Sequence, residues 1–189
     1  AAAVVRYAEQ FEPGAVWISA DTWVTAEAMG ATVKADRDDQ PLAGNGVPCI
    51  RTMADVEAIR PPDPRRAGRY PLMLEATRRV RQALGPDAFL VGCFDQYPFS
   101  AACALLGIER AMTAALEQDN VLQALMQKAA DYAVAYGQAL VEAGADMLSG
   151  GDSPAGLLGP RLYGTVAAEA ERQVIGRLQA ATGKPVSLH

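Results

Sequence analysis

Short apolar runs alternate with helix-like segments along the whole 189-residue chain, and this alternation constrains the fold more than any other feature. Such almost wholly apolar runs are typical of strands buried on both faces of a parallel sheet. Helices between them let each strand run parallel to the one before it, through right-handed crossovers. The sequence therefore predicts an α/β fold with a parallel sheet. The expected strands are residues 15–19, 88–93, 145–149 and 186–188.

Helical spacing of apolar residues and helix-end signals place the helices between these runs. Gly85-Pro86, for example, ends the segment 71–84. Thr52 and Asp55 have the spacing of a capping box, which begins a helix. The expected helices are 2–11, 22–29, 52–59, 71–84, 99–106, 108–117, 120–143 and 160–181.

This order of elements fits both a doubly wound sheet and a (β/α)₈ barrel. A dinucleotide-binding doubly wound fold would carry Gly-x-Gly-x-x-Gly just after a strand. The nearest segment, 150–156, has the wrong spacing and contains Pro154. Residues 36–51 are rich in Asp, Gly, Pro and Asn, and we expect them to form a loop excursion.

Charge and composition exclude several classes of function. The chain has 17 Lys and Arg against 22 Asp and Glu, a formal net charge of −5, which argues against a nucleic-acid partner. No apolar run approaches the ~20 residues that a membrane span needs, so we expect no membrane partner. Three cysteines without a Cys-x-x-Cys pair indicate free thiols in a reducing compartment. We therefore expect a cytoplasmic protein.

Polar residues follow each apolar run at once. Because the carboxyl ends of parallel strands share one face of such folds, active sites lie there. We predict that Asp21 and Asp152 are catalytic residues. The predicted substrate-binding residues are Asp95, Gln96, Tyr97 and Ser153, and His189, the one histidine of the sequence, follows the last run.

Structural roles stay open for the same residues. Asp21 has the place of a helix N-cap, Asp152 and Ser153 that of a polar turn, and His189 that of a rim residue. An arginine set is expected to be a solvated helix face and loop, with carboxylate recognition as the alternative. This set is Arg65, Arg66, Arg69, Arg78, Arg79 and Arg81.

Two segments resemble the uroporphyrinogen decarboxylase superfamily. Residues 152–163 are similar to the segment after a central strand in those decarboxylases, and Asp21 with Gly30, nine residues on, matches another. The resemblance extends over essentially the whole chain and implies a (β/α)₈ barrel, of which about four βα units are visible here. Since such barrels typically need ~250 residues, we expect 1–189 to be a single partial barrel domain of a longer chain. One strand would precede it and about three would follow.

Other segments resemble the cobalamin-dependent methyltransferase branch of that superfamily. Residues 97–100 are similar to its Gly-Pro-Phe-Thr turn, and 184–189 to a strand that ends in His-x-Cys-Gly. In that branch this His and Cys bind zinc with a distant second Cys. The resemblance thus implies that His189 is a Zn²⁺ ligand and that residues beyond it complete the site. It also implies methylcobalamin as methyl donor, a small thiol as acceptor, and a separate corrinoid protein.

Two other functions stay open. In a uroporphyrinogen decarboxylase, Asp21 and Ser153 would correspond to the catalytic Asp and to a Ser that contacts the tetrapyrrole, with no cofactor. The active-site Tyr of the decarboxylases would fall at about Cys103 or Ala104, which is a departure from their pattern. The remaining alternative is a non-catalytic barrel that binds a corrinoid or a tetrapyrrole.

Overall fold

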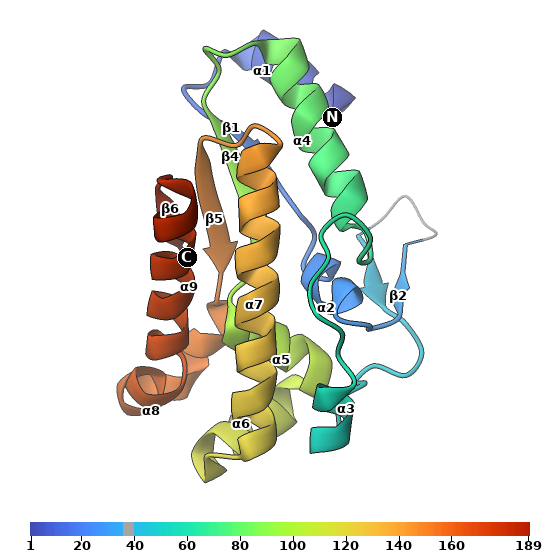
Figure 1. Ribbon diagram of the computed structural model, residues 1–189, viewed down its shortest axis with the longest axis vertical. Coiled ribbons are helices and arrows are strands. Elements are labelled where there is room, and N and C mark those ends of the chain that lie inside the picture. Colours follow the sequence, from blue (N-terminus) through green and yellow to red (C-terminus); the bar gives the residue numbers. More distant parts are fainter. Residues whose placement is uncertain (36–39) are drawn as a thin grey trace.

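The computed structural model describes residues 1–35 and 40–189 and centres on a four-stranded sheet (Figure 1). All its strands are parallel, and each one neighbours the strand that precedes it in the sheet along the chain. In a doubly wound sheet, the order in which successive strands are added across the sheet would instead reverse at a switch point. The predicted fold class, part of a (β/α)₈ barrel, is confirmed. The strands, in order across the sheet, are β1 (Val16–Ile18), β4 (Leu90–Gln96), β5 (Met147–Gly151) and β6 (Val186–Leu188).

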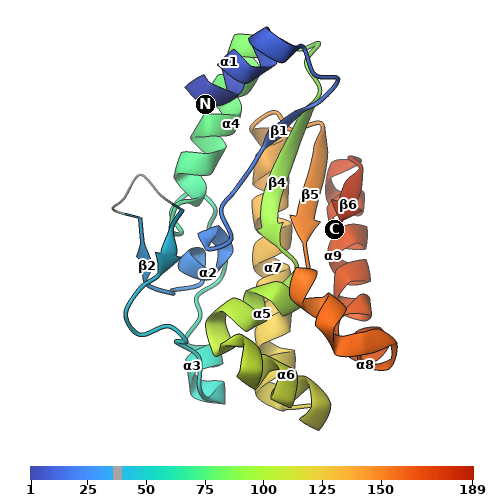
Figure 2. The same ribbon diagram turned by 180° about the vertical axis from the view of Figure 1, so that it is seen from behind.

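Long helices cover one face of this sheet. α7 (Asn120–Glu142) and α9 (Ala168–Thr182) lie in front of the strands in Figure 1 and behind them in Figure 2. α5, α6 and α8 lie where the strands end, and α1 lies at the opposite end. The remaining helical elements are α1 (Ala2–Phe11), α2 (Val24–Ala28), α3 (Met53–Glu57), α4 (Tyr70–Leu84), α5 (Pro98–Leu106), α6 (Ile108–Glu117), the 3₁₀ helix η1 (Ser153–Leu158) and α8 (Gly159–Val166).

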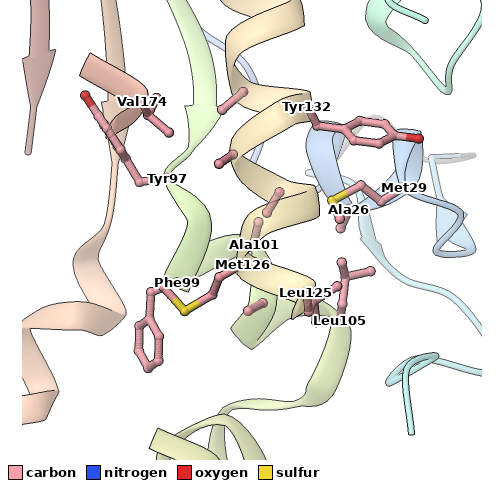
Figure 3. Close-up of a cluster of buried hydrophobic side chains, with 14 of the residues drawn as sticks. Ala26, Met29, Tyr97, Phe99, Ala101, Leu105, Leu125, Met126, Tyr132 and Val174 are labelled. Carbon is pink, nitrogen blue, oxygen red and sulfur yellow. The ribbon is translucent and has the colours of Figure 1, made fainter. Parts of the chain in front are cut away.

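The apolar face of α7 forms the centre of the core. In Figure 3, Leu125 and Met126 of α7 lie beside side chains of α5, among them Phe99. Gly137 lets α9 approach closely, since a Cβ there would lie 2.6 Å from Cδ2 of Leu178. Among the described residues, no single helix is long and apolar enough to cross a membrane, and α5 and α6 pass that test only as a pair bent by 118°.

Two predicted segments differ from the structure. The expected helix 160–181 is two helices that meet at Ala167, because α8 packs against η1 and α6 whereas α9 packs against α7 and β6. The predicted excursion 36–51 includes 36–39, which lie outside the described residues. Its described part contains β3 (Leu42–Ala43), antiparallel to β2 (Val33–Lys34). The predicted capping box of Thr52 and Asp55 is confirmed.

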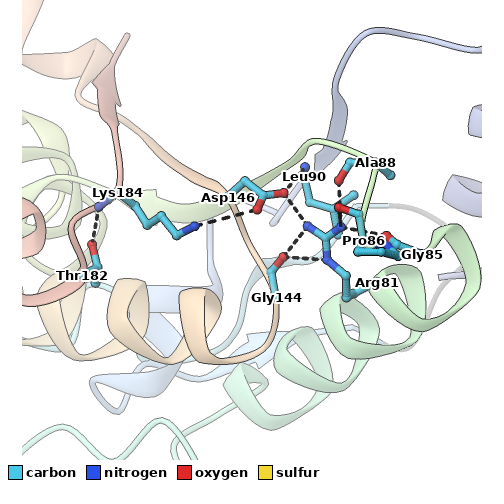
Figure 4. A network of polar contacts seen from close by, with 9 residues as sticks. All are labelled: Arg81, Gly85, Pro86, Ala88, Leu90, Gly144, Asp146, Thr182 and Lys184. Carbon is cyan, nitrogen blue, oxygen red and sulfur yellow. Dashed lines mark hydrogen bonds and ion pairs between the residues drawn. The ribbon is translucent and has the colours of Figure 1, made fainter.

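Arg81 links the amino-terminal ends of β4 and β5 to the carboxyl-terminal end of α4 (Figure 4). Its guanidinium also donates to the carboxylate of Asp146, which accepts a hydrogen bond from the main-chain N–H of Leu90 at 3.0 Å. The expectation that Arg81 belongs to a solvated face is therefore wrong, since its donors are used inside the structure. They reach the main-chain carbonyl oxygens of Gly85, Ala88 and Gly144 at 2.7–3.1 Å.

We predict that Arg81→Lys lowers the free energy of unfolding by about 2–4 kcal/mol. A lysine cannot reproduce this fork of donors, so carbonyl groups and a carboxylate lose their partners. Urea denaturation measures the change. The matched control is Arg79→Lys on the same helix, whose exposed pair with Glu75 should contribute less than about 0.5 kcal/mol. Equal effects of the two substitutions would contradict a structural role for Arg81.

Candidate active site

Two cavities lie at the carboxyl ends of the strands and share Ser153 and His189 in their walls. The larger, of about 370 Å³, also has Trp17, Asp95 and Gln96 in its wall. The smaller, of about 250 Å³, adds a different set of polar groups, namely Asp152, Tyr163 and Glu171. The structure therefore brings together the predicted site residues Asp95, Gln96, Asp152, Ser153 and His189.

The imidazole of His189 is held by the main chain of β5. Its Nδ1 lies 2.9 Å from the carbonyl oxygen of Gly150. Since a carbonyl oxygen can only accept, we assign the proton to Nδ1, which leaves Nε2 with its lone pair. The ring lies against Gly151, where a Cβ would come within 2.8 Å of Cε1 of His189. Glycine at this position makes room for the ring.

The described residues do not complete a zinc site. Among residues 1–35 and 40–189, no three His, Cys, Asp or Glu side chains are grouped so that they could hold a metal ion. Zinc in proteins needs three or four such ligands. His189 has the tautomer and main-chain hydrogen bond that are usual for a ligating histidine, and it is one candidate ligand.

Asp95 lies on a bulge of β4. Cys93 pairs with Ser149 while Gln96 pairs with Gly151, so β4 carries one extra residue there. Asp95 has φ +75°, a strained conformation for a residue other than glycine, and its carboxylate accepts a hydrogen bond from the main-chain N–H of Thr25 at 2.9 Å. Burial raises its pKa to about 7. Asp95 thus combines strain, burial and a shifted pKa, a combination typical of functional sites.

Asp152 is buried at the end of β5, beside the carboxyl group of Glu171. Its Oδ1 accepts from the main-chain N–H of Ser100 at 2.7 Å, no N–H donor among the described residues reaches Oδ2, and the carboxyl group of Glu171 lies within hydrogen-bond reach. Burial and the nearby carboxyl group of Glu171 raise the pKa of Asp152 above its ordinary range. Buried polar atoms without partners, here also Oε1 of Gln96, are typical of places that water or a ligand completes.

Asp21 faces Arg69 instead of the cavities. Both of its oxygens accept from the guanidinium, at 2.5 and 3.0 Å, and Arg69 also donates to Glu27 at 2.5 Å. These carboxylates raise the pKa of Arg69. The predicted solvated face is therefore wrong for Arg69 too. Asp21 accepts from the main-chain N–H of Trp23, although α2 begins one residue later without a side-chain cap.

Tyr97 is fully buried, and Figure 3 shows it beside Val174. Its hydroxyl donates to the carbonyl oxygen of Ser187 at 3.2 Å, and its ring packs edge-on against Phe94. This geometry supports the end of β6. Catalysis by Asp21 and Asp152, and substrate binding by Asp95, Gln96, Tyr97 and Ser153, stay predictions.

Sequence reasoning missed Glu171 and Tyr163. The Tyr163 hydroxyl donates to Oε2 of Glu171 at 2.5 Å, and Glu171 is 3% exposed. The sequence did hold one signal for Glu171, which shares a helix face with the apolar Val174 and Leu178. A carboxyl group at helical spacing within a buried face needs an explanation.

We predict that Asp95→Asn makes stability less dependent on pH. The pKa of Asp95 rises from 3.8 to about 7 on folding. The stabilisation from its proton is therefore complete below pH ~4 and is lost as pH rises through ~7. Asparagine does not titrate but still accepts from Thr25. Relative to the wild type, the variant should gain up to about 4 kcal/mol between pH 4 and pH 8. Urea denaturation across this range checks it, and parallel pH profiles would refute it.

The chain matches the uroporphyrinogen decarboxylase (URO-D) family over residues 1–189. One relative, methylcobamide:CoM methyltransferase MtaA of Methanosarcina barkeri, is 28% identical over 142 residues, which are 74% of this chain and 41% of the relative. The uroporphyrinogen decarboxylase of Roseiflexus sp. is 35% identical over 159 residues, which are 81% and 44%.

A solved structure, a methyltransferase from Methanosarcina mazei, has the same fold. Its TM-score is 0.81 at 24% sequence identity, and the match covers 98% of this chain and 54% of that chain. This chain spans about half the length of the curated relatives it matches. The relatives catalyse two reactions, and identities of 28–35% do not choose between them. The match over the whole chain shows that it belongs to the uroporphyrinogen decarboxylase family.

Proposed function

We propose that this chain forms part of a methyltransferase that moves a methyl group from a corrinoid to a small thiol. The arrangement of His189 carries this proposal. Its Nδ1 is tied to Gly150, its Nε2 keeps a lone pair, and the ring lies in the walls of two cavities. A histidine fixed in this way is suited to bind a metal ion. Relatedness to a methylcobamide:CoM methyltransferase supports the same reaction.

The reaction needs the acceptor as a thiolate, which is the nucleophilic form. A zinc ion, with further ligands from outside the described chain, would favour the thiolate. Methylcobalamin, when bound, would supply the methyl group, so that a sulfur–methyl bond would replace the cobalt–methyl bond. The bonding electron pair would stay with the corrinoid, and the thiol proton would pass to the medium. We propose that a separate corrinoid protein delivers the donor in the cytoplasm.

The residues of this chain would bind and orient the acceptor. Ser153 lies in the walls of both cavities, so its hydroxyl is placed to position a substrate between them. Trp17, on β1, offers an apolar surface that is 47% exposed. Asp95, with a pKa of about 7, can hold a proton near neutral pH beside the larger cavity.

Uroporphyrinogen decarboxylation has less support from the geometry. That reaction would require Asp21 to accept hydrogen bonds from pyrrole N–H groups. Both oxygens of Asp21 already accept from Arg69, and the side chain is 17% exposed. A tetrapyrrole would first have to displace this bidentate pair, which is among the stronger interactions of a carboxylate.

We predict that the protein containing this chain demethylates methylcobalamin when a small thiol is present. Loss of methylcobalamin absorbance and mass spectrometry of the methylated thiol measure the reaction. His189→Ala should slow it by more than roughly 10–100-fold, which is the usual cost of losing a group that only supports a metal ligand. His189→Asn is the sharper variant, because its side-chain amide can still donate to Gly150 but has no counterpart of Nε2.

The control reaction supplies uroporphyrinogen to the same protein. Decarboxylation without methyl transfer would replace the proposal by the alternative. Full methyl transfer by His189→Asn would show that Nε2 takes no part. A normal circular-dichroism spectrum of both variants ensures that any loss of activity is not a loss of fold.

A further inference from the structure

Asp95 carries the only carboxyl group among the described residues that line the larger cavity. Ser153 and His189 lie in the same wall, so a thiol held between them has Asp95 beside it. A residue that takes a proton must come within hydrogen-bond reach of the group that loses it, and a shared cavity of about 370 Å³ allows this contact.

One carboxyl oxygen of Asp95 stays available to the cavity. Its Oδ2 accepts from the main-chain N–H of Thr25 at 2.9 Å. Oδ1 forms no hydrogen bond within the described part of the chain, yet it is not among the buried side-chain oxygens that lack a partner there. Oδ1 of Asp95 is therefore accessible, in contrast to the buried Oδ2 of Asp152.

The backbone of β4 holds Asp95 in a strained conformation. The bulge gives it a φ of +75°, which is unfavourable for any residue other than glycine and persists only where surrounding contacts fix it. Thr25 supplies such contacts, because its N–H donates to Oδ2 and its hydroxyl lies within hydrogen-bond reach of the same carboxyl group. Asp95 is thus anchored on one oxygen and open on the other.

The hydroxyl of Thr25 is itself oriented from the core. The hydroxyl of Tyr70 donates to Oγ1 of Thr25 at 3.2 Å, which leaves the Thr25 proton to point toward Asp95. Thr25 and Tyr70 are both fully buried, and the ring of Tyr70 stacks on that of Tyr136 with 3.8 Å between the centroids. This chain of contacts fixes which oxygen of Asp95 faces the cavity.

We propose that Asp95 is a catalytic residue that takes the proton of the acceptor thiol on Oδ1, with Thr25 as its positioning residue. The S–H bond breaks, its electron pair stays on the sulfur as a thiolate, and the proton later passes from Asp95 to the medium. That the proton comes from a thiol rests on the function proposed above. Burial raises the pKa of Asp95 to about 7, which makes it a stronger base than an ordinary carboxylate.

Several titratable groups from neighbouring elements face Asp95. Arg69 favours the ionised form of its carboxyl group, and Asp21 opposes it. The others are Cys93, Tyr70 and Tyr136, whose pKa values burial raises, and His189 in the cavity wall. A titration seen in the reaction is therefore assigned to Asp95 by substitution of Asp95 itself.

Two thiols of different acidity test the proposal on the protein that contains this chain. Near pH ~8, 2-mercaptoethanol is almost fully protonated, whereas the electron-withdrawing fluorines of 2,2,2-trifluoroethanethiol leave it largely as thiolate. Asp95→Asn should slow methyl transfer to 2-mercaptoethanol by roughly 10²–10⁴-fold and to the fluorinated thiol by less than about tenfold. Equal losses for the two thiols would overturn the proposal, because a merely structural role does not depend on the acidity of the thiol.

Asparagine suits this position, because its side chain tolerates a positive φ and can still accept from Thr25. The matched control is Asp131→Asn on α7, whose carboxylate forms an exposed pair with Arg177 and which should change neither rate.

Substitution of Thr25 tests the positioning role. Thr25→Val removes the hydroxyl at nearly constant volume, and loss of a hydrogen bond to a carboxylate raises its pKa. We expect the acid limb of the profile of kcat/KM against pH to move up by about one pH unit. Thr25→Ser keeps the hydroxyl and should retain the wild-type profile. A profile that Thr25→Val leaves unchanged would refute the positioning role.

Ultraviolet difference spectroscopy separates this inference from the methyltransferase proposal, since a thiolate absorbs where a thiol does not. The wild-type protein mixed with 2-mercaptoethanol should give a thiolate signal that Asp95→Asn largely lacks. This difference without any methyl transfer would support Asp95 as the base while the methyltransferase proposal fails. Methyl transfer with an equal thiolate signal in Asp95→Asn would support that function and overturn the role of Asp95.

Discussion

Parallel pairing of β4 with β5 is the constraint on which the rest of the structure depends. It places Cys93 opposite Ser149 and then shifts by one residue, so that Gln96 lies opposite Gly151. That extra residue puts Asp95 on a strained backbone where its carboxylate accepts from α2. β6 adds to the other side of β5 in regular register, and this pairing brings His189 against Gly150 and Gly151. Both cavities follow from these two pairings.

Charge is distributed differently at the two ends of the sheet. At the amino-terminal ends of the strands, Asp146 forms ion pairs with Arg81 and with Lys184, and these contacts fix the chain there. At the exits, Asp95, Asp152 and Glu171 are buried without an ion pair among the described residues, and desolvation raises the pKa of Asp95 and Asp152. Paired charges of the first kind serve stability, whereas buried unpaired carboxyl groups are costly and are typical of sites for chemistry or binding.

Local signals predicted the elements well where one signal was decisive. Gly85 ended α4 and Thr52 began α3 as their residue types required. The predicted helix 160–181 failed at Ala167, because an alanine gives no local signal for a break, and the different packing partners of α8 and α9 cause it. The prediction that Arg69 and Arg81 lie on a solvated face failed because their partners are distant in the sequence. Their carboxylate partners lie 48 and 65 positions away along the chain, and no local pattern indicates such pairs.

The sequence by itself determined the order of the four strands of the parallel sheet, the presence of helices between them, and which polar residues stand at the strand ends. These depend on hydrophobic periodicity and on turn residues, which act over a few neighbouring positions. Only the tertiary structure decided which of those residues share a cavity. Asp152 shares a cavity wall with Glu171 and Tyr163, and Asp21 forms an ion pair with Arg69. The side chain of Tyr97 is buried in the core. Side-chain partnership is decided by strand register and by helix packing, which bring together residues that are far apart in the chain.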